Sequence, residues 1–402
     1  MIDIQSSELP IQLPIGFGEH ELKCLLLSAA RAGAADVNFA SGEHVNCRIS
    51  GKYRNITTRA LQNNEVQAIA RIMYGDNIMS ILGSAEYADP RYAFRIDRAN
   101  SIGFRVNITG CLINQDPDSV QITCRALPNL PLSVHDLKLP FEMAKNMFSR
   151  QGMVIVAGET GSGKSTLLAS VFRAILENSE DHKMLTFEDP IEYTYEKVAK
   201  ASSNSIYQHE LRKHIKTFEE AVKNILRRAP TDGLIGESRD KVTIAVSIQL
   251  ALTGCKTFTT VHAETCGGTL SRMVQAFDYA DQPSTLEKLV NTVRLIVVQR
   301  LVRTIDGKQT AINSWIDFDA DYKERLIGVK AEKVSQVTDG ICELRGTSVG
   351  HHAAYKVKQG IISLDAAAHA TGLHKSRIES LMTDLNDSLY EYKKEELNGV
   401  IV

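Results

Sequence analysis

The chain has 402 residues, a length that suggests two or three domains at roughly 150 residues each. Hydrophobic residues make up 43% of it and charged residues 23%, the ordinary composition of a globular protein with a sizeable core. The 46 Lys and Arg residues nearly balance 48 Asp and Glu residues, so no global basic excess supports non-specific nucleic-acid binding. No apolar run approaches the roughly 18 residues of a membrane-spanning helix, and residues 1–13 lack the basic and apolar regions of an export signal.

Seven cysteines are scattered along the chain without a Cys-x-x-Cys pair. An odd number without such spacing indicates neither a zinc site nor a disulfide framework. We therefore expect reduced, mostly buried thiols in a cytoplasmic protein.

The first part of the chain, residues 1–126, is predicted to form an α+β domain. Apolar spacing predicts helices over residues 20–32 and 63–82, and β-rich runs predict strands at 36–39, 45–49, 92–96, 102–108 and 119–124, with a turn at 51–53. Residues 127–140 are predicted to be a linker, because prolines at 128 and 131 remove backbone donors and restrict their neighbours.

From about residue 140, strands and helices alternate, a pattern typical of a parallel sheet with helices on both faces. We expect a domain over residues 141–330 and a mainly helical C-terminal region over 331–402. The predicted strands are 153–157, 184–187 and 257–261, and the predicted helices begin at residue 164 or cover 218–227, 242–252 and 286–302.

One motif dominates the sequence. Residues 158–165 match the phosphate-loop pattern G-x-x-x-x-G-K-[ST] at every fixed position, between an apolar strand and a helix. Glycines let backbone N–H groups point at phosphates, Lys164 would reach the β- and γ-phosphates, and the Ser165 hydroxyl would hold Mg²⁺. The predicted nucleotide-binding residues are Gly158, Glu159, Thr160, Gly161, Ser162, Gly163, Lys164, Ser165 and Thr166. The loop alone does not separate ATP from GTP.

Hydrolysis also needs carboxylates, and two strand ends supply them. Glu188 and Asp189 follow one apolar run, and Glu237 follows Gly236 after another. Each acid also has a structural interpretation, as a helix cap or an ion-pair partner. His262 closes a third strand, where it would either sense a phosphate or simply be a hydrogen-bonded histidine.

In this order, these segments resemble the secretion ATPase superfamily of type II and type IV secretion and pilus motors. Four motifs of that superfamily have similar segments here: the phosphate loop at residues 158–166, the aspartate box at 185–193, the Walker B motif at 236–240 and the histidine box at 259–262. Residues 164–170, 224–228 and 292–302 most resemble the DotB-like and IncI TraJ-like ATPases. The resemblance implies a RecA-like P-loop ATPase domain behind an N-terminal α+β (PAS-like) domain.

The resemblance further implies a homo-hexameric ring that uses ATP and Mg²⁺ and lies at the cytoplasmic side of the inner membrane, with secretion or conjugation proteins as partners. Glu188 would be the general base or would orient the attacking water, Glu237 would hold Mg²⁺ through water, and His262 would sense the nucleotide. Arg105 and Arg125, on strands of the first domain, would bring positive charge to the phosphates as arginine fingers do.

Three departures from the family pattern stand out. Asp232 and Gly233 replace apolar residues before Glu237, which should weaken burial of that strand. Gly103 stands where relatives commonly have an arginine, so that contact is either absent or supplied by another residue, such as Arg95. A tetracysteine insertion and the C-terminal motif of retraction motors are both absent, which favours the DotB/TraJ branch.

Two other functions remain open from the sequence: a nucleic-acid-translocating ATPase, which the balanced charge disfavours, and a nucleotide-gated assembly scaffold with negligible turnover. The sequence does not identify the cargo, whether effector protein, pilin or DNA.

Overall fold

A computed structural model describes residues 10–13, 17–49, 52–97, 100–128, 130–211 and 213–401. The chain divides into two compact units, one of Met1–Asn129 with Glu192–Thr194 and the other of Leu130–Ile191 with Tyr195–Val402. Within the described ranges, no helix is long and apolar enough to span a membrane. None of the seven cysteines, which all lie among the described residues, forms a disulfide, and all but Cys111 are buried.

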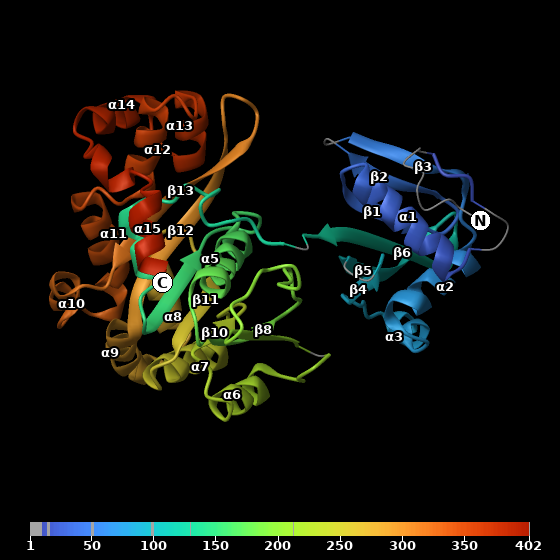
Figure 1. The fold of residues 1–402 in the computed structure, drawn as a ribbon, viewed down its shortest axis with the longest axis horizontal. Helices are drawn as coiled ribbons and strands as arrows, with labels where there is room; N and C mark the ends of the chain where they lie inside the picture. Colours follow the sequence, from blue (N-terminus) through green and yellow to red (C-terminus); the bar gives the residue numbers. More distant parts are fainter. Residues whose placement is uncertain are drawn as a thin grey trace. The chain divides into compact units, whose positions relative to one another are not determined.

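The first unit is a six-stranded antiparallel sheet in the order β3-β2-β1-β6-β5-β4, with helices on one face (Figure 1). Its core joins Leu25 and Ile69 of the helices to Phe104 and Ile122 of the strands. Its elements are α1 (Glu19–Arg31), β1 (Ala34–Ala40), β2 (His44–Ile49), β3 (Lys52–Ala60), α2 (Asn63–Tyr74), α3 (Ile78–Gly83), β4 (Arg91–Arg95), β5 (Ser101–Ile113) and β6 (Asp116–Leu127).

One prediction for this unit was wrong. The single helix expected over residues 63–82 is two helices, because α2 ends at Gly75, whose φ of 123° lies outside helical space. The turn expected at residues 51–53 falls partly on residue 51, which lies outside the described residues; Lys52 and Tyr53 begin β3.

The second unit is built on a seven-stranded sheet in the order β13-β12-β7-β11-β10-β8-β9, parallel except for β13 at one edge. Helices cover both faces: α5 packs Phe172 against Phe258 at 5.0 Å between ring centroids, and α7 packs on the other face against Met153 and Ile155. The predicted fold class, a RecA-like P-loop domain with a helical tail, is therefore confirmed.

The elements of this unit run as follows. The strands are β7 (Gly152–Ala157), β8 (Lys183–Glu188), β9 (Ser205–Glu210), β10 (Asp232–Ile235), β11 (Lys256–Val261), β12 (Val293–Arg303) and β13 (Gln309–Asp317). The helices are α4 (Phe141–Met147), α5 (Lys164–Asn178), α6 (Phe218–Leu226), α7 (Lys241–Leu252), α8 (Cys266–Gln275), η1 (Tyr279–Asp281), α9 (Gln282–Thr292), α10 (Ala320–Leu326), η2 (Ala331–Lys333), α11 (Val334–Leu344), α12 (Val349–Lys358), α13 (Leu364–Thr371), α14 (Lys375–Thr383), η3 (Asp387–Tyr390) and α15 (Lys394–Ile401).

Two predictions for this unit were wrong. The helix expected over residues 286–302 ends at Thr292, and the β-branched run after it forms β12, buried beside β7. The weakened burial expected for the strand before Glu237 is also absent, because all four residues of β10 are buried. Oδ2 of Asp232 makes hydrogen bonds with His182 at 2.5 Å and Thr231 at 2.7 Å, whereas its buried Oδ1 has no hydrogen-bond partner among the described residues. Helix α7 packs close against Gly233.

Candidate nucleotide-binding site

The phosphate loop leaves β7 at Ala157 and enters α5 at Lys164. Gly158, Gly161 and Gly163 have φ values of 146°, 80° and 86°, which a side chain rarely tolerates, so the backbone itself explains why glycine occurs at these positions. The ammonium group of Lys164 donates to the carbonyl oxygens of Gly158 and Glu159 at 2.9 and 2.8 Å. The ammonium is thus held against the loop.

The positive end of a helix faces the same loop. Ser165 and Thr166 lie in the first turn of α5, where backbone N–H groups have no partners within the helix. Such a turn attracts anions, and a glycine-rich loop in front of it lets a phosphate approach closely. The geometry of residues 158–166 is that of a phosphate cradle.

The predicted acids and histidine lie at the same edge of the sheet as the loop. Strands β7, β11, β10 and β8 are neighbours in that order and parallel, so their carboxyl ends lie together. The loop follows β7, His262 follows β11, Glu237 follows β10 with one residue between, and Glu188 ends β8. Ligands of open α/β sheets bind at this edge.

Glu237 and His262 contact each other directly. His262 Nε2 lies 3.4 Å from Glu237 Oε1, and Arg239 Nη2 lies 2.7 Å from Glu237 Oε2. Burial, with the nearby charge of Lys164, lowers the pKa of His262, although Glu237 opposes the shift. Its imidazole is therefore neutral at neutral pH and can accept or donate one hydrogen bond at the site.

Glu188 is contacted by Thr186 and Gln208, and neither contact was anticipated from the sequence. The hydroxyl of Thr186, fully buried in β8, donates to Glu188 Oε1 at 2.6 Å. Gln208 Nε2 on β9 lies 3.4 Å from the same oxygen. The Thr186 contact could have been read from period-two spacing along the strand, but Gln208 could not, because β9 itself was not predicted.

A pocket of about 720 Å³ opens beside the loop, a volume suited to a small-molecule ligand. Gly158, Glu159, Thr160 and His262 line one side of it, and α8 lines the other. Glu188 and Glu237 do not line this pocket, although they lie at the same edge of the sheet.

Arg272 of α8 also lines this pocket, and sequence reasoning missed it. Its guanidinium has no side-chain hydrogen bond or ion pair with any residue that the structure describes. Helical spacing is the one sequence signal that relates Arg272 to the pocket. Arg272 lies four residues after Gly268, one turn along the same face of α8, and both residues line the pocket.

The predicted arginines lie in the first unit, on the sheet face opposite its core. Arg105 of β5 pairs directly across the ladder with Arg125 of β6 and with Arg91 of β4. Since residues directly opposite share a face and like charges there repel, this row is costly unless anions offset it. The carboxylate of Asp36 offsets part of this repulsion. It accepts a hydrogen bond from Arg125 Nε at 2.7 Å and lies 2.8 Å from the guanidinium of Arg48.

The contacts of the two predicted arginines differ. Arg105 Nη1 lies 3.3 Å from Glu192 Oε1, in an ion pair of which both side chains are about two-fifths exposed. The hydrogen bond that Arg125 donates to Asp36 raises the pKa of Arg125, whose side chain is 62% exposed. Gly103 is covered by the guanidinium of Arg91, whereas the predicted substitute Arg95 lies at the other end of β4, opposite Ser101.

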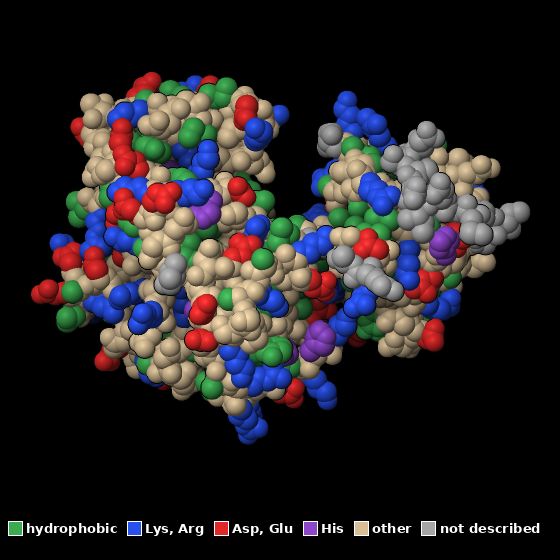
Figure 2. Space-filling view, in the orientation of Figure 1, with side chains coloured by type: hydrophobic (Ala, Val, Ile, Leu, Met, Phe, Trp, Pro, Cys, Tyr) green, Lys and Arg blue, Asp and Glu red, His purple; other side chains and the backbone are tan. Residues whose placement is uncertain are grey.

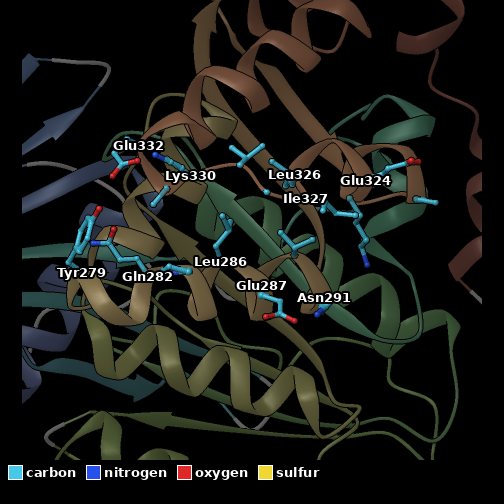
Figure 3. A pocket seen from close by; sticks show the side chains of 17 residues that line it. Tyr279, Gln282, Leu286, Glu287, Asn291, Glu324, Leu326, Ile327, Lys330 and Glu332 are labelled. Atoms are coloured by element: carbon cyan, nitrogen blue, oxygen red, sulfur yellow. The ribbon is translucent and has the colours of Figure 1, made fainter.

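A cavity of about 1260 Å³ lies elsewhere in the second unit, between α9, α10 and residues 327–332 (Figure 3). Leu286, Leu326 and Ile327 contribute apolar side chains, while lysines and glutamates alternate around them. None of the predicted site residues lines it. On the face of the molecule that Figure 2 shows, basic and acidic side chains are intermixed and do not form a continuous basic strip.

The donors at the site suit Mg²⁺ better than zinc. Among the described residues, no group of three or more His, Cys, Asp or Glu side chains is arranged to hold a metal. Mg²⁺ needs only one or two protein oxygens beside phosphate and water ligands. The hydroxyl of Ser165 and the carboxylate of Glu237 are oxygen donors of this kind.

A phosphate loop at the carboxyl edge of a parallel sheet, with acids on two neighbouring strands, defines the second unit as a P-loop nucleotide-binding domain. A family model described as "Type II/IV secretion system protein" matches residues 16–391. The chain therefore belongs to the type II/IV secretion system protein family.

The chain is 32% identical to the ATPase DotB of Legionella pneumophila, whose X-ray structure matches with a TM-score of 0.82 over 90% of this chain and 97% of that one. The crystal structure of the pilus retraction motor PilT with bound ADP matches at 25% identity and a TM-score of 0.76, over 90% and 99% of the two chains. The "Type IV pilus retractation ATPase PilT" of Pseudomonas aeruginosa is 26% identical over 88% of this chain and 97% of its own length.

The predicted superfamily and its DotB-like branch are thereby confirmed. The chain is an ATPase of the secretion and pilus motor family.

Proposed function

We propose that this chain is the ATP-hydrolysing motor of a type IV secretion system, of the Dot/Icm or IncI conjugative kind, acting as a homo-hexameric ring at the inner membrane. The observation that carries the proposal is the phosphate loop sharing one sheet edge with Glu188, Glu237 and His262. The similarity to DotB over nine-tenths of the chain supports the Dot/Icm branch.

In this mechanism the loop binds the triphosphate of ATP. Lys164 exchanges a loop carbonyl for a phosphate oxygen, and the backbone N–H groups of residues 158–166 hold the phosphates in place. Ser165 and Glu237 would hold Mg²⁺, which neutralises charge developing on the β- and γ-phosphates. Arg239 and His262, which contact Glu237, keep its carboxylate oriented toward the loop.

Glu188 takes the role of orienting the water that attacks the γ-phosphate. A carboxylate at a strand end can accept a proton or a hydrogen bond from water, and Thr186 fixes one of its oxygens. His262, neutral beside Lys164, would report whether the γ-phosphate is present, because it can hydrogen-bond to phosphate without adding charge.

The row of arginines in the first unit would complete the ring's sites. A row of like charges at direct cross-strand positions is stabilised by an anion, and a triphosphate supplies one. Arg105 and Arg125 would therefore act on ATP when the units close in the assembled ring, with Asp36, which Arg48 also contacts, holding Arg125 in place.

The proposal is tested by Lys164→Ala in the full chain, expressed in its native host. We expect loss of ATP hydrolysis and of substrate transfer, with normal levels of folded protein, because the loop keeps its backbone but loses its phosphate-binding cation. Lys200→Ala removes an exposed lysine far from the loop in sequence and should behave like the native chain. Transfer that persists in the Lys164 variant would contradict the motor function.

A further inference from the structure

Gln299 is a buried amide at the place where the phosphate loop begins. It follows the apolar run of β12 and is 4% exposed. The register pairs Val298 with Ala157, so Gln299 stands beside the loop rather than beside the sheet core. A polar side chain in such a strand requires a partner, because an unpaired buried amide is unfavourable.

That partner is the phosphate loop itself. Gln299 Nε2 donates to the carbonyl oxygen of Ser162 at 2.7 Å. A Cβ atom on Gly163 would lie 2.7 Å from the same Nε2, and one on Gly158 would overlap the backbone oxygen of Gln299. Gln299 therefore lies against both ends of the loop, and its atoms leave no room for a side chain at Gly158 or Gly163.

This contact fixes the direction of a peptide plane. In a trans peptide the C=O and the following N–H point in opposite directions. Because Gln299 draws the Ser162 carbonyl toward β12, the N–H of Gly163 points away from β12, as a phosphate cradle needs.

We propose that Gln299 is a positioning residue of the nucleotide site, which orients the Gly163 amide toward the phosphates through Ser162. The inference rests on the proposed nucleotide-binding role of residues 158–166. It extends that site to a residue more than 130 positions further along the chain, on the strand beside β7. Gln299 does not contact ATP; it acts through the loop.

The test compares Gln299→Leu, which keeps most of the volume but removes the donor, with Asn313→Leu. Asn313 lies directly opposite Gln299 on β13, is 1% exposed and does not contact the loop, so it controls for loss of a buried amide. We expect Gln299→Leu to weaken Mg–ATP binding about five- to tenfold, the worth of one hydrogen bond. Asn313→Leu should bind as the native chain does.

Three measurements separate positioning from simple stability. Calorimetry gives the affinity for Mg–ATP, turnover gives kcat, and thermal unfolding without nucleotide gives stability. A merely structural role would lower Tm and leave the affinity of the folded protein unchanged. Gln299→Glu, which turns an acceptor toward the Ser162 carbonyl, should bind more weakly than the leucine variant. Gln299→Met replaces the leucine variant if that one does not fold.

If the leucine variant (or the methionine variant in its place) and the glutamate variant both bind Mg–ATP as the native chain does, the inference about Gln299 is overturned, and the proposed function is not affected. Absence of Mg–ATP binding by the native chain would instead contradict the proposed function on which the inference rests.

Discussion

Glu188 ends β8, and one of the side chains that contact it comes from the same strand. Thr186 lies two residues earlier, on the same face, with its hydroxyl 2.6 Å from Glu188 Oε1. A carboxylate restrained in this way keeps a fixed direction, which a water-orienting residue needs.

Replacing Thr186 by Val removes this hydroxyl at little cost in volume. We expect kcat for ATP hydrolysis to fall by about tenfold with little change in KM, because the restraint acts on the reacting water and not on bound ATP. Steady-state kinetics of the purified chain measure kcat and KM separately. Thr257→Val, another fully buried strand threonine whose hydroxyl bonds main chain, is the control. Equal kinetics for the two variants would contradict this role for Thr186.

A second residue-scale prediction concerns Asp317 at the end of β13. Burial raises its pKa to about 7, against partial opposition from Lys145 and Arg345 and with support from Asp319 and Glu142. Asn146 donates to Asp317 Oδ1 at 2.6 Å and can do so to an amide as well.

Because the folded pKa lies above the usual value, the carboxyl favours the folded state below about pH 4, and this contribution is lost as the pH rises through 7. Asp317→Asn should therefore raise Tm at pH 8, by about 2–6 °C, and leave it nearly unchanged at pH 4.5. Thermal unfolding across this range measures the difference. A lower Tm for the variant at pH 8 would show that the ionised carboxylate is stabilising.

At the scale of elements, the sequence pattern predicts a helix for the apolar run after Thr292, but this run forms β12. A short run of buried apolar residues is compatible with either structure, and the helical residues before it extended the pattern. The β-branched residues at 293 and 296–298 pair beside β7 because a central parallel strand is buried on both faces. Only the sheet could show that Gln299 reaches the phosphate loop.

The strand β10 shows the opposite error. Asp232 and Gly233 suggested poor burial, yet each has a compensating neighbour. His182 and Thr231 bond the Asp232 carboxylate, and a Cβ on Gly233 would lie 2.5 Å from the Leu250 side chain. His182 lies 50 residues before Asp232, and Leu250 lies on the helix that follows β10, so the sequence pattern of β10 itself does not reveal these two contacts.

At the scale of the whole molecule, sequence patterns predict those parts of the site that lie within one continuous segment of the chain. The phosphate loop, its strand and its helix are contiguous, so the glycine spacing and the apolar run predicted them together. Glu188, Glu237 and His262 lie at one edge because parallel strands share their direction. Gln208, Arg272 and the ladder that joins Arg91, Arg105 and Arg125 depend on register or packing between distant segments, which periodicity does not encode.

The proposed ring leads to a prediction about that ladder. Arg125→Gln should reduce kcat by about a hundredfold or more while ATP affinity changes little, because an arginine finger acts on the transition state. Turnover and calorimetry on the assembled protein measure the two effects. Arg48→Gln, which leaves the Arg125–Asp36 contact in place, should have a smaller effect. Normal kcat in the Arg125 variant would exclude it from catalysis.

The most direct measurement is calorimetric titration of Mg–ATP into the Glu188→Gln chain, with phosphate release followed in parallel. If residues 158–166 bind the triphosphate and Glu188 orients the attacking water, this variant takes up ATP in a saturable reaction and releases no phosphate above background. Turnover at the native rate, or no heat of binding, would contradict the account.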